Sequence, residues 1–486
     1  MIKFLFSDIL WALLLAYLSF AAYSFMPSFI NYLELRFYDF RSGILSISSN
    51  VLPEIIEIPG DKSDVSKLDF EETGKLLPVL GTDETAPSLT VFMSQIAMPD
   101  TDKNLKEISL LKDKYEELKK NNKLRDKGGD FLKVLSGLQN TESPEKKILS
   151  SLKKIGPYVL PVYMDTGIPS GKLKEEPEWL KKHSVRAVSG AALASSRAEG
   201  ISFNVQESSI GENSAGAGHT NLFVEQDGKI RFETPFIAYN RNLYPSIALE
   251  TSRILLGISE ENIKFNPGKN MKIGEKLIPL TPESSLPVNF SSVDPIMHKS
   301  SDILAGNVAA ETFKGKTVIL CNSSGRNVNT PKGLKPECFF VISAIKTLMS
   351  DSFISRPPWT YKLEVGMLMA SAVLIMFASS LPRWLFHSMF LFAFVAVYAG
   401  SIYMFCSELI WIKPVVPMLC LSSGYLFGII KRFVLNYELK QHKIQYSSNP
   451  PPPPVIRRQA KPADVSDNHV PTNAQKTQDY PEEHLK

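Results

Sequence analysis

The segment WLFHSMFLFAFVAVYAGSIYMFC, Trp384–Cys406, is an almost unbroken run of apolar side chains. Three similar runs occur elsewhere in the chain, at Phe4–Met26, Val365–Leu381 and Leu409–Ile430. Each is close to the roughly 20 residues that an α-helix needs to cross the hydrocarbon core of a bilayer. We therefore expect four transmembrane α-helices: residues 1–26 form the first, and residues 362–430 contain the other three. The polar block 27–361 lies between them.

Basic residues beside these runs predict the orientation of the chain. Lys3 precedes the first run, Arg383 lies between the second and the third, and Lys431 follows the fourth. An even number of spans places all three positions on one side, and such residues favour the cytoplasm. Both termini are thus expected in the cytoplasm and the block 27–361 outside it. A cleaved signal peptide in the first run is the alternative, because Ala21 and Ala22 offer small residues for cleavage. Cleavage would leave the block where it is.

Composition narrows the class of protein. The chain has 486 residues and a formal net charge of +4, which is too small to argue for binding to nucleic acid. No histidine or second cysteine pair has the spacing of metal ligands, so we expect no metal and no cofactor. Cys321 and Cys338 lie in the block outside the cytoplasm, where a disulfide can persist. A bridge between them and a pair of buried free thiols are both open.

Strands alternate with helices along the block. Ile55–Ile58, Leu89–Ala97, Tyr158–Tyr163 and Thr317–Cys321 are predicted strands. Helices are expected at Pro27–Arg41, Glu145–Ile155 and Glu337–Asp351, and a further one opens at Pro245. This alternation predicts an α/β domain with a mixed sheet and flanking helices.

Three further segments give predictions that the structure can test. Gly211–Thr220 is rich in Gly and Ser and is expected to be a mobile loop. Asp227-Gly228 joins two alternating runs, a pattern typical of a β-hairpin. Lys103–Asn121, in a polar insertion at about 99–143, is amphipathic, with Leu111 and Tyr115 on its apolar face. That face is predicted to pack within the domain; binding a partner is the alternative.

The carboxyl end of the strand Thr317–Cys321 carries the most interesting candidate site. In open α/β sheets, ligands bind beyond the carboxyl ends of the strands. Candidate ligand-binding residues there are Asn322, Ser323, Ser324, Gly325 and Thr330. An ordinary polar loop is the alternative. No catalytic motif is convincing: Gly315-Lys316-Thr317 resembles a phosphate-binding loop, but it precedes a strand and lacks the first glycine. We therefore expect no enzymatic activity.

The last part of the chain changes character. Residues 431–445 continue the fourth apolar run as a cytoplasmic helix, and residues 446–486 are too polar to fold on their own. A proline-rich segment there is either a polyproline ligand for a cytoplasmic protein or a stiff spacer, and its basic residues suit anionic lipid. The residues concerned are Pro450, Pro451, Pro452, Pro453, Pro454, Arg457 and Arg458.

Several short motifs resemble the second type of CHASE domain, an extracellular sensory domain associated with bacterial cyclases and histidine kinases. They are Tyr38-Asp39-Phe40-Arg41, Asp227-Gly228-Lys229-Ile230-Arg231, Leu243–Leu249, Asn289-Phe290, Phe313–Leu320 and Thr330-Pro331. The likeness covers roughly residues 33–358 and is better from Asn221 onward, whereas the region 99–143 departs from the family. Such receptors usually carry a cyclase or kinase after the last span, where this chain has its proline-rich segment.

The resemblance implies a sensor in the bacterial inner membrane, with its large domain periplasmic or extracellular and without its own output enzyme. It would bind an unknown ligand or envelope component and signal, as a homodimer, through a separate cytoplasmic partner. A scaffold or docking subunit of an envelope complex is the main alternative. A transporter is a third and weaker alternative, because it would need polar residues inside the spans and these are few.

Overall fold

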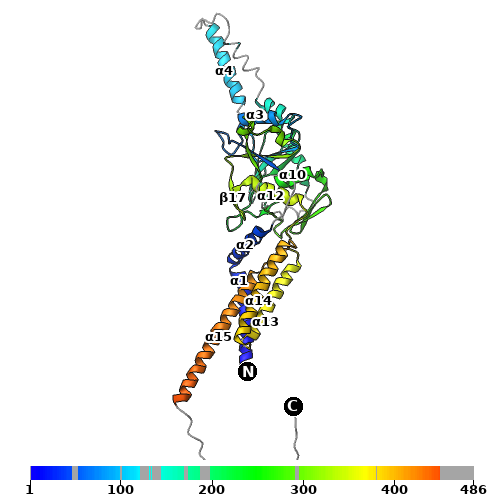
Figure 1. Cartoon of the computed structure of the whole chain (residues 1–486). Coiled ribbons are helices and arrows are strands. Elements are labelled where there is room, and N and C mark those ends of the chain that lie inside the picture. Colours follow the sequence, from blue (N-terminus) through cyan, green and yellow to red (C-terminus); the bar gives the residue numbers. More distant parts are fainter. Residues whose placement is uncertain are drawn as a thin grey trace, which may run out of the picture. The chain divides into compact units, whose positions relative to one another are not determined.

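The computed structural model describes residues 2–45, 53–98, 101–120, 131, 133, 144–168, 173–186, 198–290, 295–378 and 380–448. The chain divides into two compact units, Met1–Gly428 and Ile429–Lys486. The α/β domain lies wholly in the first unit, together with two helices that precede it and most of the apolar helices that follow it (Figure 1).

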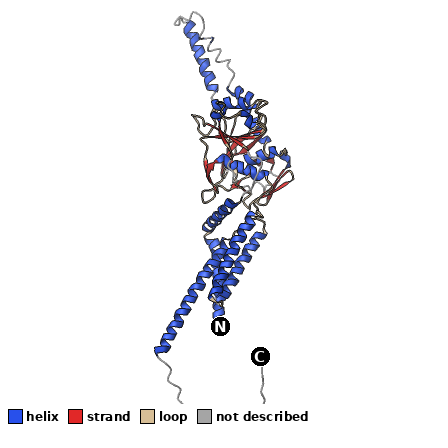
Figure 2. Cartoon of the chain, in the orientation of Figure 1, coloured by secondary structure: helices blue, strands red, loops and turns tan. Residues whose placement is uncertain are grey.

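A seven-stranded sheet forms the centre of the domain, and the strands in Figure 2 are concentrated there. Its order is β14-β1-β15-β2-β3-β5, and β6 also pairs with β3. Only β5 runs antiparallel to its neighbour; the other pairings are parallel. The predicted mixed sheet is therefore confirmed. The strands are β1 (Glu54–Ile58), β2 (Leu89–Phe92), β3 (Tyr158–Thr166), β5 (Gly200–Val205), β6 (Gly216–His219), β14 (Met297–Lys299) and β15 (Thr317–Asn322).

Helices cover both faces of the sheet. Consecutive strand residues point to opposite faces, so in β15 Ile319 packs into one hydrophobic core and Leu320 into the other. The Ile319 face is covered by α10 (Ile247–Leu255) and α12 (Glu337–Met349). The Leu320 face is covered by α3 (Phe70–Leu80) and α6 (Pro144–Leu152). With both faces buried, the strands read as continuous apolar runs in the sequence.

Smaller elements complete the domain. Three short sheets are β4-β9-β8 (Val185–Arg186, Asn242–Pro245, Phe236–Tyr239), β10-β11-β12 (Ile263–Asn266, Asn270–Ile273, Lys276–Pro279) and β7-β13 (Phe232–Glu233, Leu286–Pro287). A hairpin joins β16 (Asn327–Thr330) and β17 (Gly333–Pro336). Short helices are α7 (Glu178–Lys182), α9 (Ser208–Gly211), α11 (Ser300–Leu304), η1 (Glu260–Asn262) and η2 (Ala310–Phe313).

The prediction of a mobile loop at Gly211–Thr220 is wrong. Gly216–His219 form the buried strand β6, whose neighbour in the core is α10. A Cβ atom on Gly218 would lie 2.5 Å from the Cα atom of Ile247. Glycine is needed there because the helix lies against the strand backbone, and not because the chain must move.

The predicted hairpin at Asp227-Gly228 is only half right. The turn exists: Gly228 has φ +79°, and the Glu225 N–H donates to the Lys229 carbonyl oxygen at 2.8 Å. No strand flanks it directly, and the ladder lies further on, between β8 and β9. Its two turn residues, Asn240 and Arg241, have φ of 45° and 69°, as a primed hairpin turn requires.

Other boundaries differ slightly from the expected ones. Pro245 ends β9, and Ser246 is the residue that caps α10, because its side chain accepts from the Leu249 N–H. Helix α4 (Thr101–Lys120) confirms the predicted helix of the insertion. Its expected packing face is wrong at Leu111, which is 52% exposed, whereas Tyr115 is buried against Phe131.

Three helices are long and apolar enough to cross a membrane in the part of the chain that the structure describes. They are α13 (Trp359–Ala378), α14 (Arg383–Cys406) and α15 (Val415–Ser448). The first apolar run forms α1 (Ile2–Phe25), followed by α2 (Pro27–Ile44). These two meet the same criterion only together, as a pair bent by 87°, so the expected four spans require that this pair be counted as one.

Candidate functional site

The carboxyl edge of the sheet is where a ligand site is expected from topology. β1, β15, β2 and β3 are parallel, so the loops that follow them meet at one edge. The chain leaves β1 toward α3 on one face, and leaves β15 toward α12 on the other. Neighbouring strands whose connections diverge in this way leave a crevice between their loops.

A cavity of about 430 Å³ lies at this edge. Its walls come from the loops after β1, β2, β6 and β15, from β3 and β5, and from the first residue of α12. Most of the lining side chains are hydroxyl, amide or charged groups. They include Ser66, Lys67, Ser94, Gln95, Tyr163, Asn204, Thr220, Ser324, Arg326 and Glu337.

Asn322 holds two of these loops together. Its side-chain amide donates to the carbonyl oxygens of Val65 and Lys67, at 2.8 and 3.2 Å. Its side-chain oxygen accepts from the Ser324 N–H at 2.8 Å. Gly60 leaves room for this contact, because a Cβ atom there would lie 2.7 Å from the Val65 carbonyl oxygen. Asn322 therefore positions the wall of the cavity.

The cavity contains charges of both signs. Arg326 Nε lies 3.1 Å from Glu337 Oε2, and Lys67 Nζ lies 3.4 Å from Asp64 on the same loop. Burial raises the pKa of Glu337, and the Arg326 guanidinium opposes that shift. Hydroxyls, amides and one ion pair in a concave site suit a small polar ligand that carries both donors and acceptors.

The predicted site residues are thus divided. Ser324 and Gly325 line the cavity, and Asn322 shapes it. Ser323 is exposed beside them and its N–H donates to the Ile58 carbonyl oxygen. Thr330 is not part of the lining; its hydroxyl donates to the Gly333 carbonyl oxygen in the β16–β17 hairpin. The lining residues after β1 and β2 escaped the sequence reasoning, which followed a single strand.

Cys321 and Cys338 are free thiols here, buried on the α12 side of the sheet. Burial and the neighbouring Cys338 thiol raise the pKa of Cys321. Such thiols behave as small apolar side chains. Pro450–Pro454, Arg457 and Arg458 lie outside the described residues, as does most of the insertion 99–143 beyond α4.

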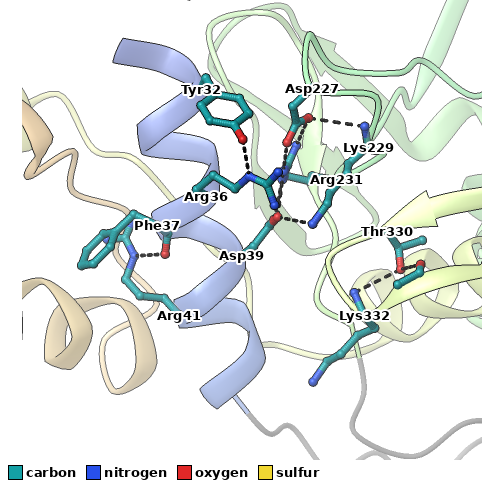
Figure 3. Close-up of polar contacts among 11 residues, drawn as sticks. Tyr32, Arg36, Phe37, Asp39, Arg41, Asp227, Lys229, Arg231, Thr330 and Lys332 are labelled. Atoms are coloured by element: carbon teal, nitrogen blue, oxygen red, sulfur yellow. Dashed lines mark hydrogen bonds and ion pairs between the residues drawn. The ribbon is translucent and has the colours of Figure 1, made fainter. Parts of the chain in front are cut away.

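A second site joins the domain to the helices that lead to the membrane (Figure 3). Asp39 of α2 accepts from Arg231 Nε at 2.6 Å and from Lys229 Nζ at 2.6 Å. Arg231 also binds Asp227, through Nη1 at 2.8 Å and Nη2 at 2.5 Å. We call Asp39, Asp227, Lys229 and Arg231 the Asp39 network. The Arg231 side chain is fully buried, so these contacts are shielded from solvent.

Tyr38 and Arg41, near Asp39 on α2, contact the membrane helices and the loop between them, and Tyr38 also packs against Phe232 of the domain. The Tyr38 ring packs edge-on against Phe405 of α14 and against Trp411, at centroid distances of 5.2 and 5.1 Å. Arg41 Nη1 donates to the Ile412 carbonyl oxygen at 2.9 Å. Consecutive positions of one helix thus bind the domain and the α14–α15 loop at the same time.

The other connector reaches the same loop. After α12, the Ser355 N–H donates to the Leu409 carbonyl oxygen, and the Trp411 N–H donates back to Ser355, both at 2.8 Å. Glu364 at the start of α13 accepts from Arg356 Nη2 and from the Lys413 N–H, both at 2.8 Å. Both chain segments that enter the domain therefore meet at residues 407–414.

The sequence motifs are what the structure brings together here. Tyr38-Asp39-Phe40-Arg41 and Asp227–Arg231 are far apart in the chain but share one network. The chain matches the family described as the CHASE2 domain over residues 12–380. This chain belongs to the CHASE2 domain family. Comparisons with curated proteins and with solved structures gave no match.

CHASE2 is a sensory, non-catalytic domain associated with cyclases and histidine kinases. The match includes α2, the sheet-edge cavity and α13. The cavity and the Asp39 network therefore both lie in the CHASE2 region of the chain. Together with three apolar helices, this sensory domain is consistent with a membrane protein.

One group of potential metal ligands occurs among the described residues: His183, Glu250 and Glu260. Arg253 already occupies it, with Nη2 at 2.6 Å from Glu250 and 3.4 Å from Glu260. His183 Nδ1 lies 3.2 Å from Glu260. A guanidinium that binds both carboxylates accounts for the arrangement as a buried ion-pair cluster.

Two buried ionisable side chains, His219 and Glu233, lie close to Ser246. His219 ends β6, next to the lining residue Thr220, and burial lowers its pKa to about 3. Glu233 of β7 is fully enclosed, and burial raises its pKa to about 7, against a hydrogen bond with Ser246. Burial therefore favours the neutral form of both side chains.

Proposed function

We propose that this CHASE2 protein is a membrane-anchored sensor. A small polar ligand, or a polar group of an envelope component, binds in the cavity at the carboxyl edge of the sheet. The observation that carries this proposal is the cavity itself, which lies where diverging connections open the sheet. Polar side chains line it from the loops after β1, β2, β6 and β15, from β3 and β5, and from the start of α12.

Ligand binding in the cavity is transmitted to the membrane helices at the Asp39 network. The cavity wall includes Glu337, the first residue of α12, and the segment that follows α12 is hydrogen-bonded through Ser355 to the loop 407–414. A ligand that draws the loops after β1 and β15 together would move α12 relative to α2. Because both connectors are hydrogen-bonded at the same loop, such a displacement reaches the membrane helices.

The cellular setting is part of the proposal. We infer that the protein crosses a bacterial inner membrane four times, with both termini in the cytoplasm and the α/β domain outside. The basic residues Lys3, Arg383 and Lys431 support this orientation. The signal then reaches a separate cytoplasmic protein through residues 431–486, whose Pro450–Pro454 run suits a polyproline-binding partner. Pairing as a homodimer fits the way the family's receptors are expected to signal.

The test of ligand binding begins with the full chain purified in lipid nanodiscs. Small molecules that co-purify are extracted and identified by mass spectrometry. The variant S324W fills the cavity and should lose the ligand at least tenfold. Ser301, which is exposed on α11 away from the cavity, provides the matched control S301W, which should retain it. Equal retention by both variants would refute the site.

Transmission needs its own readout. Hydrogen–deuterium exchange with and without the ligand should show protection at residues 65–67 and 94–95, and a change at residues 351–358. In D39N the first change should persist and the second should be lost. Loss of both would mean that Asp39 supports folding of the cavity and not coupling.

One observation favours the scaffold alternative. Leu110 and Leu111 of α4 are 69% and 52% exposed, which is unusual for adjacent leucines on a polar helix. On that reading α4 docks an envelope protein constitutively. The double variant L110S/L111S would then abolish capture of that protein, whereas the cavity variant S324W would leave capture unchanged.

A further inference from the structure

Helix α2 has a largely apolar face that the other described residues leave about half exposed. Its large exposed side chains follow one another at helical spacing of three or four residues. They are Phe29, Tyr32, Arg36, Phe40 and Ile44, with exposed fractions of 55% for Phe29 and 48% for Phe40. The opposite face is buried and carries Glu34, Tyr38 and Arg41.

The exposed face is the unusual one, because on a helix at the surface of a water-soluble protein that face is polar. The buried face is mixed, since it also carries the apolar Ile30 and Leu35. In α2 the two buried charged side chains are hydrogen-bonded to backbone groups: Glu34 accepts from the N–H of Val415, the first residue of α15, and Arg41 donates to the Ile412 carbonyl oxygen. The exposed face offers three aromatic rings and one cation. Such a face is suited to the boundary between lipid head groups and acyl chains.

The position of α2 in the chain leads to the same environment. Only Met26 separates it from α1, and the two helices are bent by 87°. If α1 is the part of this bent pair that crosses the membrane, α2 runs nearly parallel to the membrane surface. A shallow apolar groove of about 340 Å³ lies beside it, lined by Leu33 and Phe37 of α2 and by residues of α14 and α15 such as Phe394 and Met418. Arg36 is also one of the residues that line this groove.

Arg36 has the chemistry to bind a lipid phosphate. Among the described residues no carboxylate lies within ion-pair distance of it; its Nε donates to the Tyr32 hydroxyl at 3.0 Å. The exposed guanidinium therefore keeps most of its donors free for a phosphate, to which it can bind through two parallel hydrogen bonds.

We propose that α2 lies in the membrane interface on the side of the sensory domain, with Phe29, Phe40 and Ile44 among the acyl chains. A phospholipid places one acyl chain in the groove beside Phe37 and its phosphate against Arg36. The Asp39 network would then rest on the bilayer surface, and lipid packing would bias the same joint that ligand binding moves. The inference rests on the membrane anchoring in the proposed function.

Spin-label accessibility in nanodiscs of phosphatidylethanolamine and phosphatidylglycerol tests it on the full chain. Single nitroxide labels are placed through F29C, F40C and I44C, and collisions with oxygen, which partitions into lipid, are compared with those of a water-soluble nickel complex. Exposed apolar positions on the domain, L277C and L334C, are matched controls, and L391C on α14 reports membrane insertion.

The α2 labels should collide more with oxygen than with nickel, at a shallower depth than L391C, whereas L277C and L334C should show the reverse. Water-like values on α2 would overturn the proposal, and so would protection from both reagents with dipolar broadening, which would indicate a second copy. Water-like values at L391C would instead refute the membrane anchoring.

Native mass spectrometry tests the role of Arg36. R36Q should lower the number of phosphatidylglycerol molecules retained, relative to the exposed-lysine control K264Q. Equal retention would remove Arg36 from the proposal.

Discussion

Replacing Arg231 with methionine should destabilise the domain far more than removal of a surface arginine. The substitution leaves Asp39 and Asp227, whose side chains are 10% and 1% exposed, without the guanidinium that binds both. Breaking a buried ion pair from one side costs about 3–5 kcal/mol, since the remaining charge stays buried. Lys229 still contacts Asp39, so we expect about 3 kcal/mol.

The control is R326M. Arg326 also pairs with a carboxylate, Glu337, but its side chain is 58% exposed. An exposed pair contributes less than about 1 kcal/mol. The triple variant D39N/D227N/R231M neutralises every member of the Asp39 network except Lys229. It should recover much of the stability that R231M loses, because a buried ion pair can be replaced by neutral groups at little cost.

Urea pulse proteolysis of the full chain in detergent measures these free energies of unfolding. The Arg231 guanidinium lowers the pKa of Asp227, so its contribution is present above the ordinary aspartate pKa and is lost as the pH falls through the lower, folded-state value. The R231M penalty should therefore shrink in strong acid. A loss no greater than that of R326M, or a triple variant as unstable as R231M alone, would refute the reasoning.

Further predictions concern the core. G218A should lower the free energy of unfolding by at least about 2 kcal/mol, because its Cβ would lie 2.5 Å from the Ile247 backbone. G74A in α3, whose nearest contact would be at 3.7 Å, should be neutral or stabilising by up to about 1 kcal/mol. Thermal unfolding distinguishes the two variants. Glu233, with its pKa raised to about 7, favours the folded state most below the ordinary glutamate pKa of about 4.5, and this stability is lost as the pH rises through about 7, by about 3 kcal/mol in all. The variant E233Q should lack that component when free energies of unfolding are compared at about pH 5 and about pH 8, and an unchanged pH dependence would contradict it. Denaturation without a reductant, followed by alkylation and mass spectrometry, should find Cys321 and Cys338 both alkylated, because they are free thiols, whereas a bridged pair would carry no alkyl group.

Local patterns in the chain were sufficient for much of the fold. The apolar strands, the helices between them and the α/β class follow from residue type and spacing, because burial on both faces leaves continuous apolar runs. The motifs around Asp39 and Asp227 were visible as resemblance, but their meeting was not. That contact depends on the path of the chain between them, on which local sequence carries no information.

Glycine was the main source of error. In Gly211–Thr220 the same composition that permits a loop also permits a helix to lie against a strand, and the tertiary neighbours of Gly218 decide between them. Likewise, the sequence predicted only one wall of the cavity, the loop after β15. The carboxyl end of β15 is local, but which other strand ends lie beside it is a matter of sheet order.

By itself the sequence determined the α/β class, the apolar helices and the family, since these rest on the length and spacing of side chains along the chain. Only the tertiary structure decided that β15 lies between β1 and β2, that the cavity opens there, and that Asp39, Arg231 and the loop 407–414 form one joint. The physical reason is that buried ion pairs and strand order are set by contacts between residues distant in sequence, whose free energy appears only when the chain has folded.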